Sequence, residues 1–367
     1  MLDFSSALYL GLRHPSASLA PWSELTTGRP AALGVAPEAA RAAEALAALV
    51  GCERASLSPS TLHLFWDLFG VLAARPLEIF RDAGVYAVGG WGIERASALG
   101  ARVRALPHYD AAALGATLAR RAPGAAPPVV VADGYCTDCG RPAPLAGYVA
   151  AVLPHGGLVV VDDTQMLGIM GAGASRAAPF GEGGGGSLSY HGLRDSEGVL
   201  LVSSLAKGFG VPLAALAGSR AAVRAFEIAS ETRVYTSPPS TAVLRAAERA
   251  LGDSRLGGEA LRRRLAENVA RFRDGLWRHG LATTGGPFPV QSIAGFAGAA
   301  ARAVHARLHG LGVRAVLTRG ACLAGPRVVF VITATHDARA IERAARALCQ
   351  AAAELGLAPP SRAACSP

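Results

Sequence analysis

Residues 203–210 read SSLAKGFG and contain Lys207, the only lysine of the 367-residue chain. The other 35 basic residues are arginines, which stay protonated and do not act as nucleophiles. A lysine amine, in contrast, can lose its proton and form a Schiff base with a carbonyl compound. The composition therefore leaves two interpretations of Lys207 open: a reactive amine that arginine cannot replace, or a leftover surface lysine.

Short apolar segments that end just before polar residues predict strands near this lysine. Val199–Ser203 ends just before Lys207, and Leu158–Val161 ends at Asp162 and Asp163. Neither segment alternates apolar with polar residues, which is typical of parallel strands covered by helices on both faces. Further strands of this kind are expected at Ala55–Leu57, Leu77–Phe80, Val103–Leu106 and Val129–Ala132. Ala-rich helical stretches separate them, so we predict an α/β doubly wound sheet that binds ligands at the carboxyl ends of its strands.

The pattern changes near residue 252, where an Arg-rich helix is expected at Gly258–His279 and a strand at Ser292–Phe296. We predict a large, mainly parallel domain over residues 36–251 and a smaller α+β domain over residues 252–357. Residues 1–35 are expected to pack with the small domain, and residues 358–367 to form a tail.

Composition excludes several classes of protein. The net charge is +9, but the arginines are spread evenly and aromatic residues are only 6%, which argues against nucleic-acid binding. No apolar run is long enough to span a membrane, and the first residues do not resemble a signal peptide, so we expect a cytoplasmic protein without membrane contact. Cys136 and Cys139 form a single CxxC pair without a second pair at zinc spacing, so no metal site is expected there. A redox pair or a chance pair of buried thiols remains open.

Asp162 and Lys207 together indicate one particular chemistry. In enzymes that use pyridoxal 5′-phosphate (PLP), a lysine forms a Schiff base with the cofactor, and a carboxylate keeps the pyridine nitrogen protonated. Each feature alone is weak, because paired aspartates at strand ends bind metals or nucleotides as often.

Several motifs, in order along nearly the whole chain, resemble those of the α-oxoamine synthases, a family of PLP-dependent enzymes of fold type I. The motifs are FSSALYLGL at residues 4–12, DGYCTDCG at 133–140, DDTQMLGIMG at 162–171, SLAKGFG at 204–210, YTSPP at 235–239 and TATH at 333–336. The resemblance implies PLP as cofactor, a homodimer, and the large and small domains of this fold.

The resemblance also implies roles for individual residues. Lys207 is the Schiff-base lysine and Asp162 the partner of the pyridine nitrogen, while Thr137 bonds the phenolic oxygen of the cofactor. Ser204 and the backbone amides of Ser60 and Thr61 bind the phosphate, since the start of a helix favours anions. The remaining expected contacts are a phosphate contact to the neighbouring subunit from Thr236 or Ser237, and a substrate-carboxylate contact from Arg319.

The chain departs from the family pattern at several positions, among them Ala7, where the family has an asparagine. Gln165 stands where the family has a histidine, and glutamine can bond the cofactor oxygen but cannot exchange protons near neutral pH. The histidine that stacks on the cofactor ring in the family is also missing, so Trp91 or Tyr86 is expected to provide the aromatic ring that stacks there.

The resemblance implies a biosynthetic transferase that joins an amino acid to the acyl group of a thioester, carried by CoA or a carrier protein, with decarboxylation. An aminotransferase or a PLP-dependent lyase on the same fold is the alternative that Gln165 favours. A homologue that has lost catalysis and acts as a binding partner is a third possibility, against which the retained Lys207 and Asp162 argue.

Overall fold

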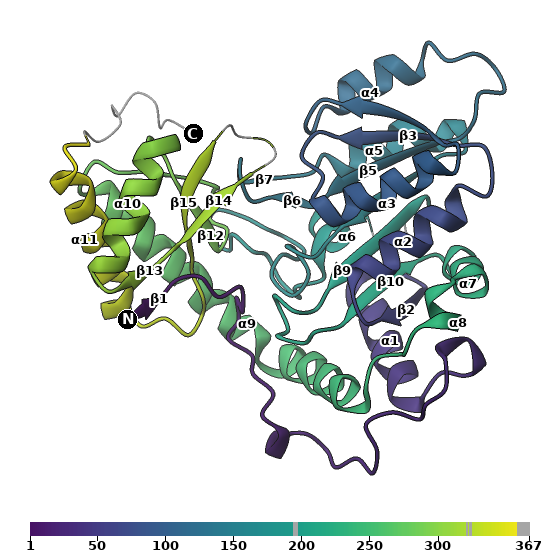
Figure 1. The fold of residues 1–367 in the computed structure, drawn as a ribbon, viewed down its shortest axis with the longest axis horizontal. Coiled ribbons are helices and arrows are strands. Elements are labelled where there is room, and N and C mark those ends of the chain that lie inside the picture. The colour runs from purple at the N-terminus through teal and green to yellow at the C-terminus, as the bar shows by residue number, and fades with distance from the viewer. Residues whose placement is uncertain (194–196, 321, 323–324, 358–367) are drawn as a thin grey trace.

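The computed structural model describes residues 1–193, 197–320, 322 and 325–357, which form two lobes built around separate β-sheets (Figure 1). The large lobe holds a seven-stranded sheet in the order β2-β10-β9-β8-β5-β3-β4. Its strands are β2 (Arg54–Ser58), β3 (Glu78–Asp82), β4 (Arg102–Leu106), β5 (Pro128–Asp133), β8 (Leu158–Asp162), β9 (Val199–Ser204) and β10 (Ala214–Gly218). β10 is antiparallel to both of its neighbours, and all other pairs are parallel.

Helices cover both faces of this sheet, as the continuous apolar runs predict. Val159 and Val161 belong to one buried cluster, whereas Val160 between them belongs to the cluster on the opposite face. The helices of the large lobe are α1 (Pro37–Val50), α2 (Thr61–Leu72), α3 (Ala87–Ala98), α4 (Ala111–Leu118), α5 (Leu145–Val152), α6 (Gly186–His191), α7 (Arg220–Ala229) and α8 (Thr232–Tyr235). The expected α/β fold with a mainly parallel large sheet is confirmed.

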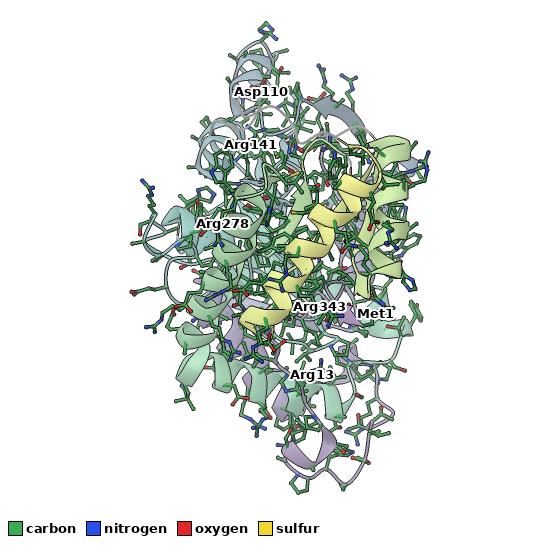
Figure 2. The ribbon with its side chains drawn as sticks, turned by 90° about the vertical axis from the view of Figure 1, so that its left-hand side faces the viewer. Met1, Arg13, Asp110, Arg141, Arg278 and Arg343 are labelled. Carbon is green, nitrogen blue, oxygen red and sulfur yellow. The ribbon has the colours of Figure 1, made fainter. Side chains whose placement is uncertain are left out.

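The small lobe contains an antiparallel sheet in the order β11-β12-β15-β14. Its elements are β11 (Thr283–Thr284), β12 (Val290–Ile293), α10 (Gly298–Gly310), β14 (Val316–Arg319), β15 (Pro326–Val331) and α11 (Ala338–Glu354). The chain start joins this lobe through β1 (Leu2–Asp3), which pairs with β13 (Val313–Arg314). Figure 2 faces this lobe, with α11 and its Arg343 across the front and Met1 beside it.

Two elements connect the lobes. Helix α9 (Thr241–Trp277) buries Leu244 in the large-lobe core and Phe272 in the small-lobe core. The short strands β6 (Tyr135–Cys136) and β7 (Arg141–Pro142) form a hairpin that lies between the two lobes (Figure 1). The division of the chain into residues 36–251 and 252–357 stays a prediction, since α9 runs unbroken across position 252.

Some elements differ from the sequence-based expectations. The long helix starts at Thr241 rather than at Gly258, and the strand expected at Ser292–Phe296 is β12 at Val290–Ile293. β10 and α3 were not predicted. The β10 sequence AALAG has the composition of the Ala-rich helices, and α3 contains three glycines, which disfavour helix when no tertiary contact is considered.

Candidate functional site

Polar residues gather at the carboxyl edge of the large sheet. Asp133 ends β5 and lies opposite Asp162, which ends β8. β9 ends at Ser204, two residues beyond the position that pairs with Asp162. Ser204 lies opposite Ala214 of β10, which in turn lies opposite Ser58 at the end of β2. The strands therefore bring polar residues that are far apart in the sequence to one edge of the sheet.

Lys207 lies in the turn after β9 and is half-buried. Burial lowers the pKa of Lys207, while the negative charges of Asp162 and Asp133 favour its protonated form. The structure thus brings the predicted lysine together with the predicted aspartate. It also adds Asp133, to which the sequence analysis assigned no role.

Close packing fixes the turn that carries Lys207. A Cβ atom on Gly208 would lie 2.4 Å from the carbonyl oxygen of Leu167, so no other residue fits there without displacing the backbone. The N–H of Phe209 donates to the carbonyl oxygen of Leu205 at 3.1 Å. The lysine backbone is therefore held against the loop that follows Asp162.

Of the two aspartates at the strand ends, Asp162 is buried and Asp133 is half-buried, and the charge of Asp162 acts on Asp133. Burial raises the pKa of Asp162, against a hydrogen bond from Thr164 and the charge of Lys207. Burial also raises the pKa of Asp133, with a further contribution from the charge of Asp162. The backbone N–H of Tyr86 donates to Asp133 Oδ1 at 3.1 Å and partly offsets that increase. A cation placed between these carboxylates would stabilise their ionised forms.

Asp163, the residue after Asp162, is fully buried. Ser187 donates to its Oδ1 from both the backbone N, at 3.0 Å, and the hydroxyl, at 2.5 Å. Gly186 has a φ of +75°, and a Cβ on it would lie 2.0 Å from Asp163 Oδ2. Burial raises the pKa of Asp163 to about 7, with the Ser187 hydrogen bonds acting in the opposite direction. Asp163 therefore fixes the loop after β8.

Gln165, the residue at the family's histidine position, has a partner from the N-terminal segment. The hydroxyl of Tyr9 donates to Gln165 Oε1 at 2.6 Å. Tyr9 is buried, and burial raises its pKa, so its hydroxyl keeps its proton. With the Gln165 carbonyl oxygen accepting from Tyr9, the amide NH₂ remains as the donor end of this side chain.

The predicted phosphate contacts lie at the start of α2 and at the end of β9. Ser60 is the N-cap residue of α2, but its hydroxyl pairs with His63 Nδ1 at 2.7 Å rather than with a backbone N–H of the first turn. The first backbone N–H groups, beginning with Thr61, are therefore left for an anion. The backbone N–H of Ser204 donates to Thr164 Oγ1 at 3.0 Å, which ties β9 to the loop after Asp162.

Thr137 and Arg319 come from different lobes but lie near each other in the fold. Thr137 is half-buried in the turn between β6 and β7. Arg319 is the exposed last residue of β14, and a Cβ on the next residue, Gly320, would lie 1.6 Å from Asp138 Oδ2. The end of β14 therefore contacts the turn that holds Thr137.

Of the remaining predicted residues, Trp91, Tyr86 and Ser237 are exposed, and Thr236 is half-buried. Trp91 is on α3 and is 51% exposed, whereas Tyr86 precedes that helix and contacts the aspartate cluster through its backbone N–H. Thr236 and Ser237 follow α8, where the Thr236 hydroxyl donates to the carbonyl oxygen of Thr232 at 2.7 Å. Within the described residues of this single chain, recorded contacts do not link Trp91, Thr236 or Ser237 to Lys207. Their roles stay predictions.

A second cluster of side chains was missed by the sequence analysis. The ligand atoms of His108, Cys136, Cys139 and Cys322 all lie within 4.8 Å of one another. Cys136 and Cys139 have no second pair at short spacing in the sequence, so His108 and Cys322 could not be recognised as their partners. The fold supplies one partner from the loop after β4 and another from the segment after β14.

Among the residues that the structure describes, no helix has the length and apolar character required to cross a membrane.

Comparisons with known proteins place the chain in a family. The model of the family "aminotransferase class I and II" matches residues 93–348. The chain is 30% identical over 321 residues to 8-amino-7-oxononanoate synthase of Nitrosococcus oceani, covering 84% of this chain and 78% of that protein. It is 29% identical to the enzyme of the same name from Stutzerimonas stutzeri, over 95% and 87% of the two chains. Its fold is similar to that of serine palmitoyltransferase of Sphingomonas wittichii, with a TM-score of 0.80 at 20% identity over 97% and 88% of the chains. The chain therefore belongs to the aminotransferase class I and II family of fold type I, and within it to the α-oxoamine synthases.

Proposed function

We propose that this protein is a PLP-dependent acyltransferase of the α-oxoamine synthase type. It joins an amino acid to the acyl group of a thioester and releases CO₂ and the free thiol. The product name of its relatives, 8-amino-7-oxononanoate, describes an amine beside a ketone, which is the kind of product that this condensation yields. The observation that carries the proposal is the interaction of the lone Lys207 with Asp162 and Asp133 at the sheet edge.

The residues at this edge fit PLP. Lys207 provides an amine for the cofactor aldehyde, and Asp162 provides a carboxylate for the pyridine nitrogen. The uncapped start of α2 at Ser60 and Thr61, together with Ser204, provides N–H and hydroxyl donors for the phosphate. The raised pKa values of the buried aspartates support this fit, since a protonated pyridine would neutralise a carboxylate that otherwise lacks a full counter-charge.

When bound, PLP supplies an electron-withdrawing ring that makes the Cα–H bond of an amino acid acidic. Lys207 would take that proton at Nζ, and burial, which lowers the pKa of Lys207, favours the neutral amine that accepts it. Asp162 would hold a proton on the pyridine nitrogen. The bond from Cα to the acyl carbon forms as the C–S bond breaks, and the departing thiolate takes a proton from solvent. After CO₂ leaves, Lys207 Nζ would return its proton to Cα.

Other residues are proposed to bind the substrate and to orient the cofactor. Arg319 offers a guanidinium for the substrate carboxylate, and the adjoining turn carries Thr137, which we assign to the phenolic oxygen of the cofactor. Gln165, held by Tyr9, would donate from its amide to the same oxygen when the cofactor is bound. Because glutamine does not titrate, Gln165 orients and does not transfer protons, and we assign proton transfer to Lys207.

We also propose a homodimer, in which Thr236 or Ser237 of one subunit reaches the phosphate site of the other. The neighbouring Tyr235 is 84% exposed in the single chain, as expected of an aromatic side chain that a second subunit covers. The cytoplasmic location stays a prediction.

The test is a screen of the purified holoprotein with single amino acids, each with and without acyl-CoA. We expect equal amounts of CO₂, from carboxyl-labelled amino acid, and of free CoA, measured by chromatography. Formation of a keto acid without CoA release would instead identify an aminotransferase, the alternative that the family relationship does not favour.

Variants of Lys207 provide the control. Lys207→Arg keeps the positive charge but cannot condense with an aldehyde, so we expect it to lose both the visible absorbance of the attached cofactor and the activity. Retention of wild-type absorbance and turnover in Lys207→Arg would overturn the proposal.

A further inference from the structure

His108, Cys136, Cys139 and Cys322, here called the thiol–imidazole cluster, come from three separate parts of the chain. Cys136 ends β6, and Cys139 lies in the turn to β7. His108 follows β4, and Cys322 follows β14 of the small lobe. Three thiols and one imidazole with their ligand atoms within 4.8 Å of one another form a compact set of four potential metal ligands.

The recorded distances match the edges of a tetrahedron around one ion. Cys136 Sγ and Cys322 Sγ are 3.5 Å apart, and Cys139 Sγ and His108 Nε2 are 3.4 Å apart. Zinc–ligand bonds of about 2.3 Å to sulfur and about 2.0–2.1 Å to nitrogen place tetrahedral ligand atoms roughly 3.5–3.8 Å from one another. Two of the six ligand–ligand distances therefore already match a single-ion site, and the others lie within 4.8 Å.

A buried carboxylate orients the imidazole. His108 Nδ1 lies 2.7 Å from Asp82 Oδ1. Asp82 is 1% exposed and also accepts hydrogen bonds from Tyr109 N at 2.7 Å and from the Tyr148 hydroxyl at 3.0 Å. With the Nδ1 proton donated to Asp82 Oδ1, the lone pair of Nε2 faces the thiols. Such a carboxylate–histidine pair is the usual outer support of a metal-bound histidine.

A tight backbone turn brings Cys136 and Cys139 close together. The N–H of Gly140 donates to the carbonyl oxygen of Cys136 at 2.8 Å, and Gly140 has a φ of +69°. A Cβ on Gly140 would lie 2.0 Å from Gly285 Cα, so this turn also requires glycine for space. The N–H of Cys139 points to Cys136 Sγ at 3.5 Å and stabilises negative charge on that sulfur.

Charge around the cluster is also compatible with a dication. Three thiolates, one neutral imidazole and Zn²⁺ sum to a single negative charge. Arg141, two residues after Cys139, interacts with the Cys139 sulfur and offsets that charge. Thiolate and imidazole ligands select zinc over the oxygen-preferring Mg²⁺ and Ca²⁺.

We propose that Cys136, Cys139, Cys322 and His108 bind one Zn²⁺ ion in a closed, structural site. Binding releases one proton for each thiol that is still protonated. Four protein ligands fill the tetrahedron and leave no position for substrate, so the ion has a structural role. It ties the β6–β7 hairpin to the segment after β14, and thus holds the turn of Thr137 against the strand of Arg319. A disulfide between Cys136 and Cys322 is the competing outcome, but such a bond would make no use of the imidazole that Asp82 orients toward the thiols.

The first experiment measures metal in the untagged, full-length holoprotein, purified under reducing conditions without a chelator. Elemental mass spectrometry should find about one zinc per chain in the wild type and in the control variant Cys349→Ala, whose cysteine lies on α11 outside the cluster. Cys322→Ala and Cys139→Ala each remove a ligand, so their zinc affinity should fall below that of the wild type. The fall should exceed the roughly 10–100-fold loss of affinity that follows when only a hydrogen-bond partner of a ligand is removed. Competition with a chromophoric chelator measures that change.

A second measurement does not depend on any variant folding. Zinc X-ray absorption of the wild type should show three sulfur neighbours at about 2.3 Å and one nitrogen neighbour at about 2.0–2.1 Å. Any of three results would overturn the proposal. They are a reduced wild-type protein that takes up no zinc, unchanged zinc affinity in Cys322→Ala, and a Cys136–Cys322 disulfide in protein alkylated at cell lysis.

Discussion

Asp133 and Asp162 lie directly opposite each other at the ends of β5 and β8, and the charge of Lys207 interacts with both. Burial raises the pKa of each aspartate, and the charge of Asp162 raises that of Asp133 further. A protonated pyridine nitrogen would stabilise the ionised form of the carboxylate beside it. The pair raises the question of which carboxylate would face that nitrogen.

We predict that Asp162 is that partner. Asp162→Asn keeps the shape but loses the charge that holds a proton on the ring, so we expect kcat to fall by at least about 100-fold. Asp133→Asn is the matched control, because it removes the neighbouring carboxylate from the same edge, and kcat should fall much less. Steady-state kinetics of both holoproteins test this. The reverse order would assign the role to Asp133.

The bond between Tyr9 and Gln165 should be measurable as a coupling energy. Tyr9→Phe removes the hydroxyl that donates to Gln165 Oε1, and we expect the free energy of unfolding to fall by about 1 kcal/mol. Tyr9→Phe combined with Gln165→Ala should cost less than the sum of the two single variants, since the two share one interaction. Urea unfolding of the four proteins gives the cycle. Strict additivity would show that the contact contributes nothing.

Gly186 should tolerate a side chain far less well than Gly173. Both have a positive φ, +75° and +70°, but a Cβ on Gly186 would meet Asp163 Oδ2 at 2.0 Å, whereas one on Gly173 meets nothing within 4 Å. We expect Gly173→Ala to cost about 1–2 kcal/mol from backbone conformation alone. Gly186→Ala should cost clearly more. If denaturant unfolding gives the same loss of unfolding free energy for both variants, the loop after Asp163 can shift to make room for the added Cβ.

Asp163 should make stability depend on pH. Its pKa is raised to about 7 from 3.8, so the folded state favours the protonated form. The unfolding free energy contributed by this group is therefore largest below pH 4 and is lost as the pH rises to about 7. The loss amounts to about 1.4 kcal/mol for each unit of pKa change. Asp163→Asn should lack this slope, and should gain stability relative to wild type between pH 5 and pH 8. The same pH dependence in both proteins would contradict the assignment.

The sequence predicted the parts of the fold that depend on local pattern. The buried runs ending at Asp162 and Ser203 are strands because both faces are covered, and that property is visible in an unbroken apolar segment. β10 could not be found in this way, since AALAG fits a helix equally well and becomes a strand only by pairing with β2 and β9.

The site shows the same limit. Lys207 and Asp162 were found because one is unique and the other ends a strand. Asp133 ends its strand in the same manner and could have been found by the same signal. The Cys136–Cys322 and Tyr9–Gln165 contacts span 186 and 156 residues, so no spacing rule connects them. Such pairs exist only once the chain has folded.

The single lysine also makes this protein easy to follow chemically. The chain has only two primary amines, the N-terminal amino group and Lys207 Nζ. Once the thiols are blocked, an amine-selective reagent can thus add mass at no more than two places in this sequence, and one of them is half-buried at the sheet edge. Counting added groups by intact-mass spectrometry would therefore report directly, without mutation or tags, what fraction of molecules leaves that amine accessible.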